Sequence, residues 1–106
     1  MTPAEQALKL LGLAARAGTV LPGTERVREA ARSGRLTFAV LAADASENSR
    51  GKLAPLLAAR RIPFVIRFDR VQLGAAVGRA PLGAVGLIDS SLGRRLQSLL
   101  AAEPSA

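Results

Sequence analysis

The sequence predicts an α/β fold, a three-layer α/β/α sandwich around a mixed sheet of roughly four strands. Short apolar segments alternate along the chain with longer segments that carry apolar residues at helical spacing. Helices that separate strands in this way cover both faces of the sheet. The chain of 106 residues contains no linker-like stretch and no internal repeat. Residues 1–106 are therefore expected to form one domain around one core.

The first helix is expected from Pro3 to about Arg16. Thr2 and Glu5 fit a capping box, and proline suits the first helical position between them. Gly18 follows the last residue with helical spacing, and a glycine at this place is typical of a helix end.

A short strand and a second helix are expected next. Residues 19–21 form a short extended piece that includes β-branched residues. The second helix begins at Thr24, whose hydroxyl is expected to cap it, and stops at Gly34. Gly23 precedes this helix, and its structural explanation is that the turn needs either a positive φ or close backbone approach.

The central strand is expected within residues 36–43, a nearly unbroken apolar run that is typical of a strand buried on both faces. Asp44 and Ser46 are both capping residues, so a third helix is expected from about Ser46 to Arg61. Pro55 lies inside this span, and a kink or a later helix start is the alternative.

The rest of the chain continues the alternation. The expected elements are a strand at 62–68, a short helix from a cap at Asp69 with Gln72 to near Gly78, a loop at 79–83, a strand at 84–88, and a helix from Ser90 or Ser91 through Leu100. Gly74 and Gly78 permit either close approach of a ligand or tight packing of the short helix on the sheet, and packing is the commoner reason. Residues 103–106 are expected to be a frayed tail.

The charge of the chain indicates an anionic partner. The formal net charge is +7 and the isoelectric point is near 11.7. Such a surface attracts phosphate backbones of any sequence, although basic charge also aids solubility. The bases are spread along the whole sequence, so folding must assemble any basic patch.

Missing residue types exclude several function classes. The chain has no cysteine for a disulfide or a thiolate zinc site, and no histidine for acid-base chemistry near neutral pH. It has neither of the glycine-loop nucleotide signatures, and its three phenylalanines lie in apolar strand contexts. We therefore expect no enzyme activity, no metal and no cofactor. The absence of a signal peptide and of a long apolar run predicts a cytoplasmic protein without a membrane partner. We expect a monomer.

Several short sequence motifs occur in a characteristic order. They are LLGLAARAG at 10–18, the start of the second helix at Gly23–Glu25, the end of that helix near Gly34, AVLAADASEN at 39–48, IPFV at 62–65, the glycine pattern at 73–78, and AVGLID at 84–89. Over about residues 4–95 the chain resembles the kink-turn RNA-binding ribosomal proteins typified by large-subunit proteins seven-Ae and thirty-e. The nearest likeness is to the small bacterial YlxQ-like members of that family.

The resemblance implies RNA binding at two regions. Kink-turn binders of the family carry a G-x-N-E-x-x-K pattern that reads sheared G·A pairs, and an apolar loop that covers a flipped-out base. Gly23 and Thr24 match the opening of this pattern, whereas Glu25, Arg26 and Glu29 stand where it has Asn, Glu and Lys. An acid in place of the lysine is expected to weaken phosphate contact.

The function implied by the resemblance is non-catalytic binding of a kinked or structured (ribosomal) RNA. The candidate RNA-binding residues are Gly23, Thr24, Glu25, Arg26, Arg28, Arg32, Arg79, Pro81, Leu82 and Gly83. The first two would offer main-chain or hydroxyl donors, the helix arginines would engage phosphates or a guanine edge, and the loop would cover a base.

Three other interpretations stay open. The helix arginines Arg26, Arg28 and Arg32 would form a solvated face if Glu25 and Glu29 pair with them locally. The protein would be a protein-interaction module, as the same sandwich is in the stress-response branch of the family. It would otherwise be a ribosome-assembly factor without kink-turn specificity.

Overall fold

The computed structural model describes residues 1–102, and the expected tail at residues 103–106 lies outside the described residues. The elements alternate in the predicted order. They are α1 (Pro3–Arg16), β1 (Val20–Pro22), α2 (Thr24–Ser33), β2 (Phe38–Leu41), α3 (Glu47–Ala59), β3 (Phe64–Ile66), α4 (Arg70–Ala76), β4 (Ala84–Leu87) and α5 (Ser90–Ala102). None of the helices within residues 1–102 has the length and hydropathy of a membrane span.

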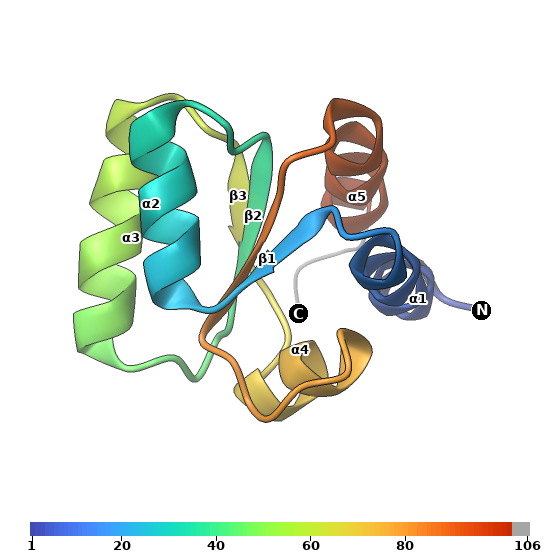
Figure 1. Cartoon of the computed structure of the whole chain (residues 1–106). Helices are drawn as coiled ribbons and strands as arrows, with labels where there is room; N and C mark the ends of the chain where they lie inside the picture. The colour runs from blue at the N-terminus through green and yellow to red at the C-terminus, as the bar shows by residue number, and fades with distance from the viewer. Residues whose placement is uncertain (103–106) are drawn as a thin grey trace.

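The strands form one mixed sheet in the order β1-β4-β2-β3. β2 pairs in parallel with β3 and antiparallel with β4, and β4 pairs antiparallel with β1. Helices α2 and α3 cover one face, and α1 and α5 cover the other, with α4 beside α1 (Figure 1). The predicted three-layer α/β/α sandwich with a four-stranded mixed sheet is confirmed.

The core consists of two apolar layers that meet at β2. Phe38 and Val40 face the layer under α1 and α5, whereas Ala39 and Leu41 face the layer under α2 and α3. All four side chains of β2 are buried. Because successive strand residues point to opposite faces, burial on both faces explains why this strand is apolar without interruption.

The direction of the strands brings three helix starts to one edge of the sheet. β1, β2 and β3 run the same way, and β4 runs the opposite way. The residues that follow β1, β2 and β3 and those that precede β4 therefore lie at the same edge, where α2, α3 and α4 begin (Figure 1). We call this the helix-start edge, and the opposite edge, where α2 and α3 end, the helix-end edge.

The strand expected at 62–68 is shorter than predicted. β3 ends at Ile66, and Phe68 has a positive φ of 66°. The carbonyl of Phe68 accepts a hydrogen bond from the amide of Ala43 at 2.7 Å, and its side chain packs against the core under α1 and α5. The left-handed residue turns the chain out of the strand direction so that α4 can begin two residues later.

Helix α3 passes through Pro55. The helix begins at Glu47 after its cap Ser46, whose hydroxyl accepts a hydrogen bond from the amide of Ser49 at 3.1 Å. The alternative of a later start is therefore wrong. The residue four positions before the proline is the exposed Gly51, and its carbonyl is the one that loses its usual helical amide partner.

Helices α2 and α3 end in backbone turns of the same type. In each, one amide bonds to the carbonyl three residues back, and the next amide bonds to the carbonyl five residues back. The left-handed residue of this turn is Gly34 after α2, with a φ of 77°, and Arg61 after α3, with a φ of 56°. Glycine adopts this conformation without strain, whereas any residue with a Cβ is strained there.

We predict that Arg61→Gly increases the free energy of unfolding by about 1 kcal/mol, because it removes the strain of a left-handed residue with a Cβ. Urea denaturation followed by circular dichroism measures the change. The matched control, Gly34→Ala, places a Cβ in the same turn after α2 and should lower the unfolding free energy by about 1 kcal/mol. An unchanged or lower stability of Arg61→Gly would contradict the prediction.

Candidate functional site

The two regions that the sequence indicates separately meet at the helix-start edge. The amide of Gly23 donates a hydrogen bond to the carbonyl of Ala84, at 2.8 Å. A Cβ on Gly83 would lie 3.2 Å from Oγ1 of Thr24 and 3.9 Å from Oγ of Ser49. The loop at 79–83 therefore lies against the starts of both α2 and α3.

Backbone hydrogen bonds hold this loop in place. They join Arg79 N–H to the Gly74 carbonyl at 2.8 Å, Leu82 N–H to the Arg70 carbonyl at 3.1 Å, and Ala42 N–H to the Gly83 carbonyl at 2.9 Å. A Cβ on Gly74 would clash with the carbonyl of Ala80. Tight packing is thus the reason for Gly74, but the expectation that the sheet is the packing partner is wrong, because α4 packs against the loop here.

Helix α2 begins without a side-chain cap. Its N-cap is Gly23, and among residues 1–102 no side chain accepts a hydrogen bond from its first amides. The other helices each have such an acceptor, namely Thr2 for α1, Ser46 for α3, Asp69 for α4 and Asp89 for α5. The amides of Glu25 and Arg26 at the positive end of α2 are thus open to an acceptor from outside the chain.

The prediction that the Thr24 hydroxyl caps α2 is wrong. Thr24 is the first helical residue, one position too late to be the cap. Its hydroxyl lies beside Gly83, 3.2 Å from where a Cβ of that residue would be. The cap position belongs to Gly23, with φ 102° and ψ 150°. Only glycine commonly adopts this conformation, and a Cβ there would meet nothing within 4 Å. Of the two reasons given for Gly23, the structure supports the positive φ.

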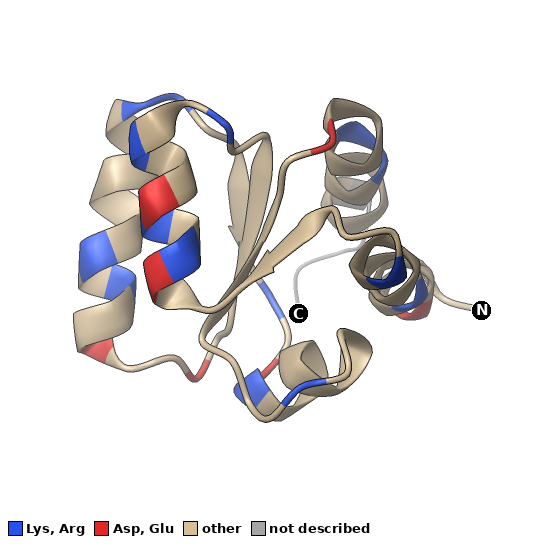
Figure 2. Ribbon diagram, in the orientation of Figure 1, with Lys and Arg blue, Asp and Glu red and all other residues tan. Residues whose placement is uncertain are grey.

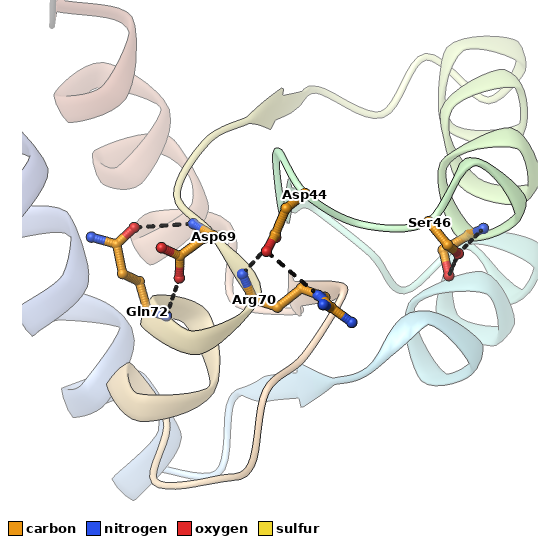
Figure 3. Close-up of polar contacts among 6 residues, drawn as sticks. Asp44, Ser46, Asp69, Arg70 and Gln72 are labelled. Atoms are coloured by element: carbon orange, nitrogen blue, oxygen red, sulfur yellow. Dashed lines mark hydrogen bonds and ion pairs between the residues drawn. The ribbon is translucent and has the colours of Figure 1, made fainter.

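The start of α4 is occupied by the chain's own carboxylates. Asp69 and Gln72 form a reciprocal capping box, and Asp44 accepts a hydrogen bond from the amide of Arg70 at 2.8 Å (Figure 3). The other oxygen of Asp44 lies 3.5 Å from Nε of Arg70. The expectation that Asp44 helps to cap α3 is wrong, because it stabilises α4 instead. Ser46 caps α3 in its place (Figure 3).

The arginines near the start of α2 differ in their surroundings. Arg28 forms an ion pair with Glu25 at 3.2 Å, and its side chain is 21% exposed. Local pairing of these two residues is thus confirmed. Nε of Arg28 and Nε of Arg50 are buried without a hydrogen-bond partner among the described residues. Arg26 is exposed and projects from the first turn.

Arg32 lies apart from the other candidate residues. It stands eight residues after Thr24, which is about 12 Å along a helix axis. Its carbonyl accepts a hydrogen bond from the guanidinium of Arg60 at 3.0 Å. Arg32 therefore belongs to the helix-end edge. A hollow that is lined by Glu25, Arg28, Glu29, Arg32 and Ser33 runs along α2 between the two edges.

The apolar residues of the loop differ in exposure. Pro81 is exposed, whereas Leu82 is half-buried and packs against the core under α1 and α5. Pro81 is thus the freer of the two to cover a ligand, and the exposed Arg79 stands beside it in the chain.

Sequence reasoning missed the start of α3 as part of this site. Ser49 and Arg50 lie in the first turns of α3. Ser49 lies beside Gly83 of the loop, and Nε of Arg50 is buried without a hydrogen-bond partner among the described residues. The signal was present, because β2 and β3 form a parallel pair joined by α3. In such a unit the helix starts at the carboxyl edge of the strands, where ligands bind in open α/β sheets.

The sequence matches the Ribosomal protein L7Ae/L30e/S12e/Gadd45 family over residues 5–93, most of its length. The chain belongs to this family. It is 32% identical over 91 residues to a Bacillus subtilis protein named RNA-binding protein YlxQ, with 86% of this chain and 91% of that protein covered. It is 26% identical over 96 residues to the Enterococcus faecium protein of the same name, covering 91% and 92%.

Solved structures of this family's fold also superpose well. A protein of unknown function from Bacillus halodurans C is 35% identical and gives a TM-score of 0.86, covering 90% of this chain and 96% of that one. The Giardia lamblia 15.5kD RNA binding protein gives a TM-score of 0.78 at 18% identity, covering 93% and 85%. The second likeness shows that the fold is shared.

We predict that Gly23→Ala lowers the free energy of unfolding by about 1–3 kcal/mol, because alanine cannot adopt the glycine backbone conformation without strain. Thermal and urea unfolding measure the loss. The control is Gly51→Ala, an exposed position inside α3 with open space around a Cβ. It should raise stability by about 0.5–1 kcal/mol. Equal effects of the two substitutions would show that the conformation of Gly23 is not required.

Proposed function

We propose that this protein binds structured RNA, without catalysis, through the start of α2 and the loop at 79–83. The observation that carries the proposal is the uncapped N-terminus of α2 beside this loop. Phosphate oxygens bind at helix N-termini because the amides and the helix dipole both favour negative charge. Relatives named as RNA-binding proteins over nearly the same length support RNA as the anion. An RNA partner also favours a cytoplasmic location.

The residues at the edge suit distinct parts of an RNA. The open amides of Glu25 and Arg26 would donate hydrogen bonds to a phosphate, and the exposed guanidiniums of Arg26 and Arg79 would bind neighbouring phosphates or a guanine edge. Pro81 would cover an unstacked base. Arg28 contributes positive charge only in part, since Glu25 is already its partner.

The RNA feature that we propose is a kink. The acids at Glu25 and Glu29 argue for weaker contact than in family members with the full pattern, yet the ion pair with Arg28 offsets the charge of Glu25. The test is a titration of a kink-turn RNA and a straight duplex of the same length, each at low and near-physiological salt. Tight binding that prefers the kink and survives the higher salt supports the proposal. Equal binding that salt abolishes would leave charge attraction alone, and another RNA or a protein partner would then be sought.

We predict that Arg26→Glu with Arg28→Glu weakens RNA binding by far more than about tenfold at moderate salt, because the first change replaces a phosphate-binding cation by an acid and the second leaves two acids unpaired beside the open amides. Fluorescence anisotropy with labelled RNA measures the affinity. The control, Arg94→Glu with Arg95→Glu, makes the same change in net charge on exposed positions of α5. If both pairs of substitutions lower the affinity equally, the effect is one of overall charge, and Arg26 and Arg28 do not belong to the RNA-binding site.

We also predict that Glu25→Gln raises RNA affinity by about two- to fivefold at low salt, because it removes an acid beside the open amides and releases Arg28. The same titration measures the gain. Glu5→Gln is the control, since Glu5 lies in the first turn of α1, away from this edge. A fall in affinity for Glu25→Gln would mean that the carboxylate itself contacts the RNA.

A further inference from the structure

We propose that Arg32, Arg35 and Arg61 form a second RNA-contact surface at the helix-end edge, which binds the phosphate backbone of an RNA stem. This inference rests on the proposed function, because it concerns an RNA already bound at the helix-start edge. We call the three residues the distal arginines.

Packing of α2 against α3 assembles the distal arginines from separate segments. Arg60 donates hydrogen bonds through its guanidinium to the carbonyls of Ala31 and Arg32, at 3.3 and 3.0 Å. This contact joins the end of α3 to the end of α2, so Arg61 lies beside the last turn that carries Arg32. Figure 2 shows the basic segments gathered where the two helices end.

The charge at this edge is unbalanced. Residues 30–37 and 56–63, which surround the ends of α2 and α3, contain four bases and no acid. The acids of α2 and α3 are Glu25, Glu29 and Glu47, which all precede the last turns (Figure 2). Among residues 1–102 no distal arginine forms an ion pair, and all three are exposed. Phosphate groups would supply the missing negative charge.

The negative ends of the helices do not account for three further cations. Arg60 already binds two of the last carbonyls of α2. A helix end carries only about half an elementary negative charge, so one cation offsets it. The Nε atom of Arg35 donates to the hydroxyl of Ser33 at 3.3 Å, which leaves its terminal nitrogens for another partner.

Arg61 occupies a position where glycine would be less strained. Its φ of 56° corresponds to that of Gly34 in the equivalent turn after α2. Backbone stability therefore favours glycine at this place, and the arginine adds only a charge and a planar donor group. Strained backbone residues cluster at functional sites, and the exposed guanidinium is the group by which Arg61 would serve one here.

The two edges lie close enough for one RNA to reach both. Helix α2 has 10 residues, so its ends are about 15 Å apart. This is shorter than one helical turn of a duplex. The hollow along α2 is lined by Arg28 and Arg32 together with the acids Glu25 and Glu29, and it lies between the two surfaces. An RNA with its kink at the helix-start edge would extend one stem along this hollow to the distal arginines.

The test compares a kink-turn RNA with short stems and the same RNA with both stems extended by one helical turn. The variant is Arg32→Gln, Arg35→Gln, Arg61→Gly. It should weaken binding of the long-stem RNA by about tenfold or more at moderate salt and reduce the salt slope by about 2, while binding of the short-stem RNA changes less than about threefold. The control is Arg16→Gln, Arg94→Gln, Arg95→Gln, which removes the same charge from α1 and α5.

Arg61→Gly alone separates RNA contact from folding, since it relieves backbone strain and should not destabilise the protein. It should weaken only the long-stem complex, by about threefold. Equal losses on both RNAs, or a loss matched by the control variant, would overturn the inference. If the proposed function itself is wrong, the result is different, because the wild-type protein would bind the short-stem kink-turn RNA no better than a straight duplex.

Discussion

The burial of β2 on both faces is the constraint on which the rest of the structure depends. Each of its side chains lies in one of two apolar layers, so helices must cover the sheet from both sides. A crossover helix must join β2 to its parallel partner β3, whereas its antiparallel partner β4 runs in the opposite direction. Three helices consequently start at one edge and two of them end at the other, which separates the positive ends of their dipoles from the negative ends.

The candidate site arises where local stabilisation is incomplete. Four helices have a side-chain acceptor at their N-terminus, and a cap of this kind contributes about 1 kcal/mol. Helix α2 lacks one, and its cap residue Gly23 has a conformation that only glycine adopts readily. A bound phosphate would take the place of the missing cap. In the proposed function the same amides would serve ligand binding at a small cost to the stability of the free protein.

Family membership concerns the fold of this protein, whereas its surface residues differ from the family's kink-turn pattern. The chain belongs to the L7Ae/L30e/S12e/Gadd45 family over most of its length, and the shared fold places α2 beside the loop at 79–83. Glu25, Arg26 and Glu29 nonetheless differ from the kink-turn pattern. The ion pair of Glu25 with Arg28 shows how one departure is offset locally. The excess of arginine at the helix-end edge offers positive charge elsewhere, so a changed pattern need not mean a lost partner.

The sequence by itself determined the order of the elements, the fold class and the caps at Thr2 and Asp69, because periodicity and capping depend on residues a few positions apart. It also indicated both proposed RNA regions. Only the tertiary structure decided that Asp44 binds Arg70 and that Arg60 binds the end of α2. It likewise showed that α2 has no side-chain cap and that its start lies against Gly83. Three of these features join residues more than twenty positions apart, and their distances depend on how helices and strands pack rather than on local propensity.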